Sequence, residues 1–444
     1  MTGINSAEAR DFCRSLLLET LRYLAVGPRL RETLRRRNGV LEIAGETHPE
    51  RRFQSIRVVS FGKVAREMAA VAAELLAGAG LRGIVVAPDA APLPGGRDSA
   101  FESFQGGHPY PNAQSCRAAE ATLALLENCS RDDLVLFLIS GGGSALLEKS
   151  LYRSVSREDL GKFHEVLVTC GATIYEANVL RKHFSAVKGG RLAEQAAPAT
   201  QATLYVSDVP DHLPSTVASG PTMPDESTTE DCRRIAASYD LLPKFPGSIR
   251  AVFESGEIAE TPKAGHPVFA RSSYYCLLSN REGVGKLVEL ARAKGLGAET
   301  DVSCDDWEFR KAADYLLARL GALRQQHPGR PVVVVSGGEL SCPVSGEGVG
   351  GRNQAFVLDC VAKIAGQPIV VLSAGTDGID GNSPACGAIA DGDSAGRAAR
   401  LGLDPESFLR EGNSYRFFEK LGDAMVTGPT GTNVRDLRIL MAYS

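Results

Sequence analysis

Polar and charged residues follow five short apolar segments of this 444-residue chain, and glycine accompanies most of them. They are Gly62 and Lys63; Ser140, Gly141, Gly142, Gly143 and Ser144; Asp208; Gly337, Gly338 and Glu339; and Asp377. In open α/β sheets, ligands bind beyond the carboxyl ends of the strands, where the next helix presents its backbone N–H groups. Glycine at such a turn lets the backbone approach an anion closely. The pattern therefore predicts a site for a phosphate-bearing ligand, built from several strand ends.

Two of these segments carry hydrogen-bond donors suited to a phosphate. Lys63 stands at a predicted strand-to-helix turn and can donate to a phosphate oxygen; the alternative is a surface lysine. The run 140–144 (SGGGS) is suited to cradle a phosphate at a helix N-terminus. Ser144 is equally suited to be an ordinary N-cap, and the two roles are compatible.

Three acids, Asp208, Glu339 and Asp377, can hold Mg²⁺ through their carboxylate oxygens, although each alone is more often an N-cap or a surface residue. Phosphoryl transfer depends mainly on positioning and charge stabilisation, so cations, acids and backbone amides are the parts that it requires. The chain has no Walker GxxxxGK[ST] sequence, no GxSxG elbow and no HRD or DFG kinase signature. We therefore expect nucleotide and Mg²⁺ chemistry without a P-loop.

Arg352 and Asn433 are candidate ligand contacts near the C-terminus. Arg352 follows the glycine-dense stretch 345–351 at a predicted helix start, where a guanidinium suits a phosphate or carboxylate; the alternative is a salt bridge on the helix surface. Asn433 ends the segment 427–433 (TGPTGTN), which either binds a ligand or forms a turn between the last two strands.

The segment 178–191 is basic in a nearly neutral chain and includes Lys188 and Arg191. It either lines a cleft for an anionic substrate or forms a solvated basic helix face. The histidines are scattered, and His108 and His183 are interpreted as structural hydrogen-bonding residues rather than metal ligands. No arrangement of Ser, His and Asp indicates a catalytic triad.

The elements that must position these residues alternate between β-branched runs and alanine- or leucine-rich stretches. The predicted strands are 56–60, 83–87, 134–140, 203–207, 274–279, 299–303, 331–336 and 368–373. The predicted helices after residue 60 include 64–78, 112–129, 157–171, 281–295, 306–326 and 353–365. Near-continuous apolar strands are typical of parallel sheets that are buried on both faces. The alternation predicts α/β architecture.

Residues 6–37 are predicted to be a helix, with Ser6 as a candidate N-cap and a break or kink at Pro28. Arg35–Arg37 would then form the C-terminal end of this helix and complement its dipole. A boundary between domains is predicted in the proline- and glycine-rich stretch 242–272.

Composition narrows the class of protein. Glycine accounts for 47 of the 444 residues, the net charge is −4, and apolar residues make up 43%. The apolar content is typical of a globular protein and argues against a collagen, a coiled coil or a disordered chain, and the length suggests two or three domains. The glycine content of about 11% is above the average of about 7%. The charge argues against a dedicated nucleic-acid binder, and no apolar run approaches the roughly 20 residues that cross a bilayer.

The cysteines and the N-terminus indicate the compartment. The ten cysteines contain no CxxC pair, and the first residues lack a basic segment followed by an apolar one. We therefore expect a reduced, cytoplasmic protein.

Several of these segments together resemble the class II glycerate 2-kinases, a family with a DUF4147 N-terminal region and a MOFRL C-terminal region. The segments are Gly62–Lys63, 107–109 (GHP), 140–146 (SGGGSAL), 181–192 (RKHFSAVKGGRL), 207–209 (SDV), 218–222 (ASGPT), 336–339 (SGGE), 351–354 (GRNQ), 374–381 (AGTDGIDG) and 427–433 (TGPTGTN). As an ordered set they are highly specific for the family.

The resemblance implies Mg²⁺-assisted transfer of the ATP γ-phosphoryl group to the 2-hydroxyl of D-glycerate, with 2-phosphoglycerate as product. It implies that Lys63 and Arg352 are key active-site cations. It also places the acids Asp208, Glu339 and Asp377 and the amide of Asn433 in the same cleft. Asp208 and Asp377 are both candidates for accepting the hydroxyl proton. The implied partners are small molecules only, with neither nucleic acid nor membrane, and the implied assembly is a monomer or homodimer.

The implied fold has two α/β domains with mainly parallel sheets, a Rossmann-like N-terminal domain, and the active site in the interdomain cleft. The predicted organisation is an N-terminal helical segment (1–44) able to pack on the C-terminal domain, the Rossmann-like domain (45–245), a linker (246–271) and the C-terminal domain (272–444) with the MOFRL region at about 330–441.

Two departures from the family pattern affect the substrate site. Asp211, His212 and Leu213 replace the common Gly-Asp after the Ser-Asp strand, and Asn112 stands where many members have Asp.

Two other functions are alternatives to the kinase. A hydroxypyruvate reductase that uses NAD(P)H would need a GxGxxG turn after the first strand, where this chain has a single glycine. A nucleotide sensor would bind ATP without transferring phosphate.

Overall fold

The computed structural model describes residues 4–343 and 347–443, which form two compact units. We name them by their sheets: the parallel-sheet unit is Val26–Leu277, and the mixed-sheet unit is Met1–Ala25 together with Leu278–Ser444. The division after Ala25 differs from the predicted boundary at 44/45. No helix within the described ranges is both long and apolar enough to cross a membrane.

The parallel-sheet unit has a central six-stranded sheet. Its strands, in spatial order, are β6 (Phe101–Gln105), β5 (Arg82–Ala87), β4 (Ser55–Phe61), β7 (Asp133–Ile139), β8 (Thr200–Val206) and β9 (Ser272–Leu278). The four pairings from β6 to β8 are all parallel. In chain order the arrangement is third, second, first, fourth, fifth, sixth, which is the order of dinucleotide-binding folds. The strand order reverses between β4 and β7, so a ligand site is expected at the carboxyl ends of these two strands.

Helices cover both faces of this sheet because the side chains of each strand alternate between faces. In β5, Ile84 and Val86 pack in one apolar cluster with residues of α4 and α8, whereas Val85 packs in another with α3. The helices of this part are α3 (Ala65–Leu75), α4 (Ala113–Leu126), α5 (Gly143–Leu146) and α8 (Arg191–Ala196).

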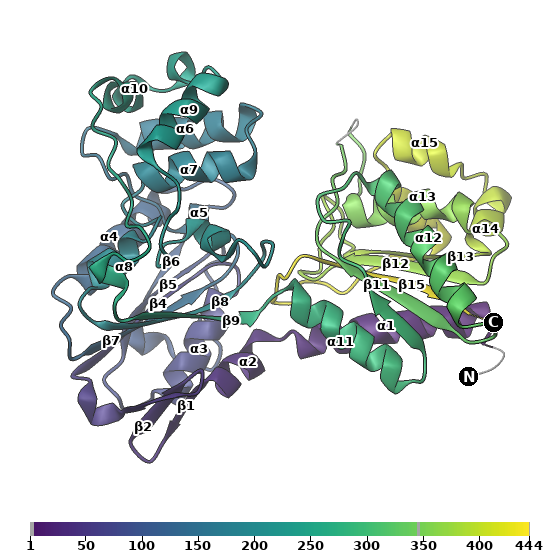
Figure 1. Ribbon diagram of the computed structural model, residues 1–444, viewed down its shortest axis with the longest axis horizontal. Coiled ribbons are helices and arrows are strands. Elements are labelled where there is room, and N and C mark those ends of the chain that lie inside the picture. The colour runs from purple at the N-terminus through teal and green to yellow at the C-terminus, as the bar shows by residue number, and fades with distance from the viewer. Residues whose placement is uncertain (1–3, 344–346, 444) are drawn as a thin grey trace. The chain divides into compact units, whose positions relative to one another are not determined.

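A second core lies among four further helices, which Figure 1 shows grouped together. They are α6 (Arg157–Thr169), α7 (Ile174–Phe184), α9 (Thr229–Ser238) and α10 (Gly247–Glu254). The rings of Phe163, Phe184, Phe245 and Phe253 contact one another with centroid separations of 5.0–5.8 Å. The predicted linker 246–271 is therefore wrong in part, because α10 contributes to this core.

The predicted helix over residues 6–37 is interrupted. α1 (Ser6–Tyr23) is capped by Asn5 rather than Ser6, and α2 (Val26–Thr33) begins two residues before Pro28. Proline is tolerated there because the first N–H groups of a helix have no partner within the helix. The break falls instead at residues 24–25.

Arg35–Arg37 belong to a strand and not to a helix end. A three-stranded antiparallel sheet forms from β1 (Leu34–Arg37), β2 (Val40–Ile43) and β3 (Glu46–Pro49). Asn38 and Gly39 connect the first two strands with φ values of 52° and 73°, as a tight hairpin turn requires. This Asn-Gly pair is the sequence signal that the helix prediction overlooked.

The mixed-sheet unit contains the second six-stranded sheet. Its strands, in spatial order, are β10 (Gly297–Thr300), β11 (Val332–Gly337), β15 (Asp436–Ala442), β12 (Ile369–Gly375), β13 (Gly387–Asp391) and β14 (Ala424–Met425). The predicted strands here, β10, β11 and β12, are parallel to one another. β15 lies between β11 and β12 and is antiparallel to both, so this sheet is mixed and not mainly parallel as predicted. The predicted α/β fold class is confirmed.

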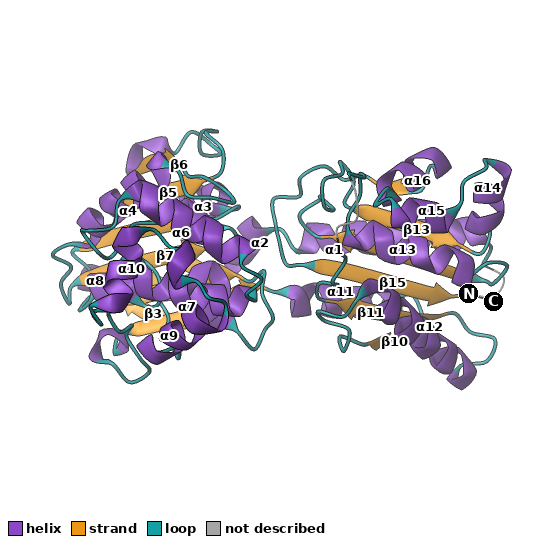
Figure 2. Cartoon of the chain, turned by 90° about the horizontal axis from the view of Figure 1, so that it is seen from above, coloured by secondary structure: helices purple, strands orange, loops and turns teal. Residues whose placement is uncertain are grey.

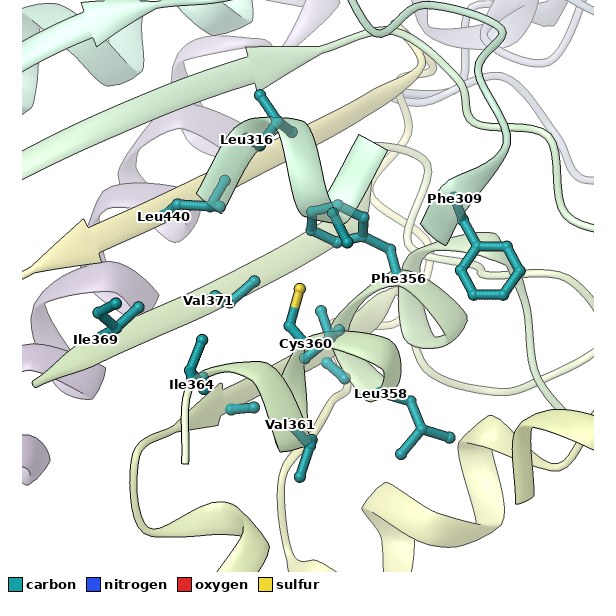
Figure 3. Packing of buried hydrophobic residues seen from close by; sticks show 14 of the residues in the cluster. Phe309, Leu316, Phe356, Leu358, Cys360, Val361, Ile364, Ile369, Val371 and Leu440 are labelled. Carbon is teal, nitrogen blue, oxygen red and sulfur yellow. The ribbon is translucent and has the colours of Figure 1, made fainter. Parts of the chain in front are cut away.

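Helices again cover both faces of the sheet. They are α11 (Asn280–Ala293), α12 (Phe309–Gln326), α13 (Arg352–Lys363), α14 (Ser394–Arg400), α15 (Pro405–Arg410) and α16 (Ser414–Leu421). In Figure 1, α1 and α11 lie on one side of this sheet and α12 and α13 on the other; Figure 2 shows the second pair lying over the strands. Figure 3 shows Phe356 and Cys360 of α13 in the buried cluster that also contains Val371 and Leu440 of the sheet.

Candidate active site

Three of the predicted segments meet at the switch point of the parallel-sheet unit. The last residue of β4, Phe61, pairs with Ile139 at the end of β7, and Ile139 also pairs with Tyr205 near the end of β8. The turns that follow these strands therefore leave the sheet side by side. They contain Gly62 and Lys63, the run 140–144, and Asp208, so the structure brings these predicted residues together.

Ser140 joins the first two turns. The N–H of Lys63 donates to the carbonyl of Gly141 (2.9 Å), and the Ser140 hydroxyl accepts from the N–H of Val64 (3.2 Å). Gly62 has a φ of +125°, and a Cβ built on it would lie 2.1 Å from Ser140 Oγ. Only glycine fits here, because any side chain would have to displace both the hydroxyl and the backbone of residue 140.

Gly62→Ala is expected to lower the free energy of unfolding by about 2–5 kcal/mol, since it adds both an unfavourable φ and a steric clash. Gly78→Ala is the matched control, because Gly78 also has a positive φ (+78°) but no atom lies within 4 Å of its built Cβ. The control is expected to lose only about 1–2 kcal/mol. Urea unfolding measures the free energy of unfolding of both variants. Equal losses in Gly62→Ala and Gly78→Ala would show that the clash with Ser140 adds nothing.

The loop 141–142 has charged and aromatic neighbours. A Cβ on Gly141 would lie 1.9 Å from Oδ2 of Asp208. A Cβ on Gly142 would lie 3.1–3.2 Å from Cδ2 and Nε2 of His108 and 3.4 Å from Cγ of Lys63. The glycines thus allow a carboxylate, an imidazole and a lysine to approach one short stretch of backbone.

Ser144 has an internal partner. Its hydroxyl lies 2.7 Å from that of Ser219, which in turn donates to Oδ1 of Asn178 (3.2 Å). The N-cap of α5 is Gly142, with no side-chain hydrogen bond, so the N-cap role predicted for Ser144 is wrong. Ser144 instead ties the glycine loop to the segment that contains Ser219.

Lys188 and Arg191, predicted to contact substrate, are buried in the parallel-sheet unit. Lys188 is 1% exposed; it donates to Glu148 Oε2 (2.7 Å) and to the carbonyl of Leu147 (3.2 Å). Arg191 donates to the carbonyl of Glu260 (3.1 Å). Lys188 lies between α7 and α8 and Arg191 begins α8, and both side chains are buried, so the structure does not place these two cations at a solvated site.

Glu148 is the centre of this buried network. It also accepts from Ser185 Oγ (2.6 Å) and lies 2.9 Å from Nε2 of His164. Burial alone raises the pKa of Glu148, but Lys188 and His164 outweigh it and lower the pKa from 4.5 to about 2. The stabilisation from this carboxylate is therefore present above pH 4.5 and is lost as the pH falls toward 2.

Lys188→Met is expected to lower the free energy of unfolding by about 3–5 kcal/mol, because it leaves the Glu148 carboxylate buried without its cation. The double variant Lys188→Met/Glu148→Gln should recover part of that loss. Lys149→Met, which breaks the exposed pair with Glu120, is the control and should change stability by less than about 1 kcal/mol. If Lys188→Met were as stable as Lys149→Met, the buried pair would not contribute to the free energy of unfolding.

In the mixed-sheet unit the predicted residues gather around Arg352, the first residue of α13. Its guanidinium makes two hydrogen bonds to Asp436, from Nε to Oδ2 (2.6 Å) and from Nη2 to Oδ1 (3.1 Å). Nη2 also lies 2.9 Å from Glu339 Oε1. Burial opposes the charge of Arg352, but the two acids raise its pKa further above the usual value. A third of the side chain remains exposed, so this fixed cation is accessible.

The Gly337–Glu339 turn follows β11 and is held by two polar side chains. The N–H of Gly338 donates to Asn280 Oδ1 (2.9 Å), and the N–H of Glu339 donates to Asp305 Oδ1 (3.0 Å). A Cβ on Gly337 would lie 1.9 Å from the Asn280 oxygen. These amides are already bonded within the protein, and the glycines serve this close packing.

Asp377 and Asn433 lie in two loops that contact each other. Asp377 Oδ1 accepts from the N–H of Ile379 (3.1 Å), and Asn433 Oδ1 accepts from the N–H of Arg435 (3.2 Å). A Cβ on Gly375 would lie 3.4 Å from Asp377 Oδ1 and 3.6 Å from Asp436 Oδ1. Asp377 is thus close to the acid that holds Arg352. Ser345 and Gly346, in the glycine-dense loop before Arg352, lie outside the described residues.

Two acids at the centre of this group were not predicted. Asp436 is 1% exposed and holds Arg352, and Asp380 accepts from the N–H groups of Asn353 (3.1 Å) and Gln354 (2.8 Å) at the start of α13. Burial, aided by the charge of Asp436, raises the pKa of Asp380 to about 7 against the effect of those N–H groups. The sequence did contain a signal for Asp436, because this acid directly precedes the segment 437–442, which is apolar except for Arg438.

Fold and site together define an α/β protein of two units, each of which collects cations, acids and glycine-rich turns at the ends of its strands. Models of two protein families match the chain: "Domain of unknown function (DUF4147)" at residues 12–254 and "MOFRL family" at residues 332–436. The first alone spans more than half of the chain.

Similar proteins were found by sequence and by structure. A D-glycerate 2-kinase of Thermotoga maritima is 36% identical over 89% of this chain and 92% of its own length. A putative hydroxypyruvate reductase of Agrobacterium vitis is 37% identical over 88% of each chain. The crystal structure of a glycerate kinase from Thermotoga maritima superposes with a TM-score of 0.84 at 32% identity, covering 98% of this chain and 100% of that one. This chain belongs to the class II glycerate 2-kinase family, as the sequence resemblance predicted.

Proposed function

We propose that this protein transfers the γ-phosphoryl group of ATP to the 2-hydroxyl of D-glycerate, giving 2-phosphoglycerate and ADP. The observation that carries the proposal is the meeting of Lys63, the glycine loop 140–144 and Asp208 at one switch point, in a chain similar to a D-glycerate 2-kinase over most of its length. The substrates are small molecules. The proposal places the enzyme in the cytoplasm as a monomer or homodimer.

The proposed reaction depends mainly on charge stabilisation. A bond forms between the 2-hydroxyl oxygen and the γ-phosphorus, while the bond to the β,γ-bridging oxygen breaks and its electrons leave with ADP. Negative charge is spread over the transferred group in between, so fixed cations lower the barrier. In this proposal Lys63 and Arg352 supply those cations. Arg352 suits the role because Asp436 and Glu339 already hold its guanidinium in place.

The acids fit a magnesium ion that is shared with nucleotide phosphates. Among residues 4–343 and 347–443, no three His, Cys, Asp or Glu side chains are grouped as a metal cage. Mg²⁺ in kinases is usually bound by one or two carboxylates and by phosphate oxygens, so single acids satisfy it. Asp208, Glu339 and Asp377 are the proposed candidates, of which one or two would act as ligands; Asp208 lies against the Gly141 backbone. When bound, the ion would neutralise charge on the β- and γ-phosphates.

The name of the Agrobacterium vitis relative favours a second candidate, an NAD(P)H-dependent hydroxypyruvate reductase. The first turn of a dinucleotide fold uses glycines so that a pyrophosphate can approach the backbone. Here Ser140 fills the space beside Gly62 that a pyrophosphate would need. The Ser140 hydroxyl also accepts a hydrogen bond from the N–H of Val64, just before α3. This packing favours the kinase.

A coupled assay with D-glycerate, L-glycerate and tartronate tests the proposal. With ATP and Mg²⁺, the protein is expected to release ADP and to form 2-phosphoglycerate from D-glycerate. Formation of 3-phosphoglycerate, or no release of ADP, would contradict it. Oxidation of NAD(P)H on addition of hydroxypyruvate would instead support the reductase.

A further inference from the structure

His108 occupies a fixed position beside the glycine loop. It follows Gly106 and Gly107, and the Gly106 N–H donates to the carbonyl of Ala87 at the end of β5 (3.0 Å). The Gly107 N–H donates to Ser115 Oγ (2.9 Å), and a Cβ on Gly106 would lie 2.7 Å from the carbonyl of Leu146. The backbone that carries the imidazole is therefore held by a strand end, by the start of α4 and by α5.

The ring edge of His108 reaches the same backbone as Lys63. Cδ2 and Nε2 of the ring and Cγ of Lys63 all lie within 3.4 Å of the position of a Cβ on Gly142. Both side chains are exposed, so a ligand at the switch point can contact both. The sequence predicted only a structural hydrogen-bonding role for His108. Its exposure and its place beside Lys63 indicate that it also contacts a ligand.

We propose that His108 contacts the substrate and accepts the proton of the 2-hydroxyl group as phosphoryl transfer proceeds; this inference rests on the proposed function. The O–H bond breaks, its proton moves to a ring nitrogen, and the oxygen forms the new bond to the γ-phosphorus. The imidazolium then returns the proton to solvent, to which the side chain is exposed.

The charges around the loop suit this role. Lys63 extends from the turn after β4, and Asp208 lies over Gly141 from the turn after β8. Partial burial and the positive charge of Lys63 lower the pKa of His108 below its usual value, so the ring is neutral and ready to accept a proton near pH 7. An anionic substrate on Lys63 would offset that charge and make the imidazole a better base when substrate is bound.

The test compares His108→Gln with wild type over pH 5–9 in the D-glycerate assay, with His266→Asn, at an exposed site, as the control. A general base contributes about 10²–10⁴-fold, so kcat/KM of His108→Gln should fall by at least 10²-fold while KM for ATP is retained. The acid limb of the wild-type profile should disappear in this variant. Wild-type kcat with an unchanged acid limb would overturn the proposal; thermal unfolding checks that the variant is folded.

A binding measurement separates this inference from the proposed function. In protein with ¹³C-labelled histidine, the ring signal of His108, assigned by its loss in His108→Gln, should shift when D-glycerate is added. Absence of that shift would overturn the contact, even in an active kinase. If wild type forms no 2-phosphoglycerate, the proposed function fails and the proton transfer with it, while a shifted signal would still support the contact.

Discussion

Lys63→Ala is expected to lower kcat/KM for D-glycerate by about 10³-fold and to leave the fold intact. Removing one electrostatic donor from a site of charge development typically costs 10²–10³-fold, and a full charge is lost here. The side chain is exposed, whereas the turn is held by the Lys63 N–H and by Ser140, which the substitution does not touch. Steady-state kinetics with detection of ADP measures the loss.

Lys63→Arg is the matched control. It retains the charge but replaces a compact ammonium by a wider, planar group beside Gly142 and His108. Activity between that of wild type and that of the alanine variant is expected. Turnover at the wild-type level in Lys63→Ala, with an unchanged melting temperature, would remove this residue from the proposed site.

Arg352→Ala is expected to lower kcat/KM by at least about 10³-fold and also to destabilise the mixed-sheet unit. The carboxylate of Asp436 is 1% exposed and would lose a bidentate partner. Because Arg438 still lies 3.4 Å away, we expect the moderate cost of an unsatisfied buried acceptor, about 1–3 kcal/mol. Urea unfolding and kinetics on the same preparations separate the two effects.

The double variant Arg352→Ala/Asp436→Asn distinguishes catalysis from support. Replacing the unpaired Asp436 carboxylate by a neutral amide should recover stability, whereas activity should stay low because the Arg352 cation is still missing. Arg352→Lys keeps the charge but cannot make the two parallel hydrogen bonds, and intermediate activity is expected. If activity returned together with stability in the double variant, Arg352 would be a structural residue only.

The structure places the same kind of residue in very different surroundings. Lys63 and Lys188 both stand beside glycine in basic or strand-end segments, and both were predicted to bind substrate. Lys63 is exposed at the switch point, while Lys188 is 1% exposed on Glu148. Glu148 lies 40 residues away in the chain, so no local pattern could reveal that pair.

The sequence by itself determined the α/β class and the segments at the strand ends, because apolar periodicity and glycine-rich turns are local properties. Only the tertiary structure decided which segments meet. The placement of β15 between β11 and β12 depends on pairing between distant residues, such as Gly375 with Asp436. It brings Asp436 beside Arg352, which lies 84 positions away in the chain. Long-range pairing of this kind, and the burial that follows from it, determines which charges are held inside and which remain available to a ligand.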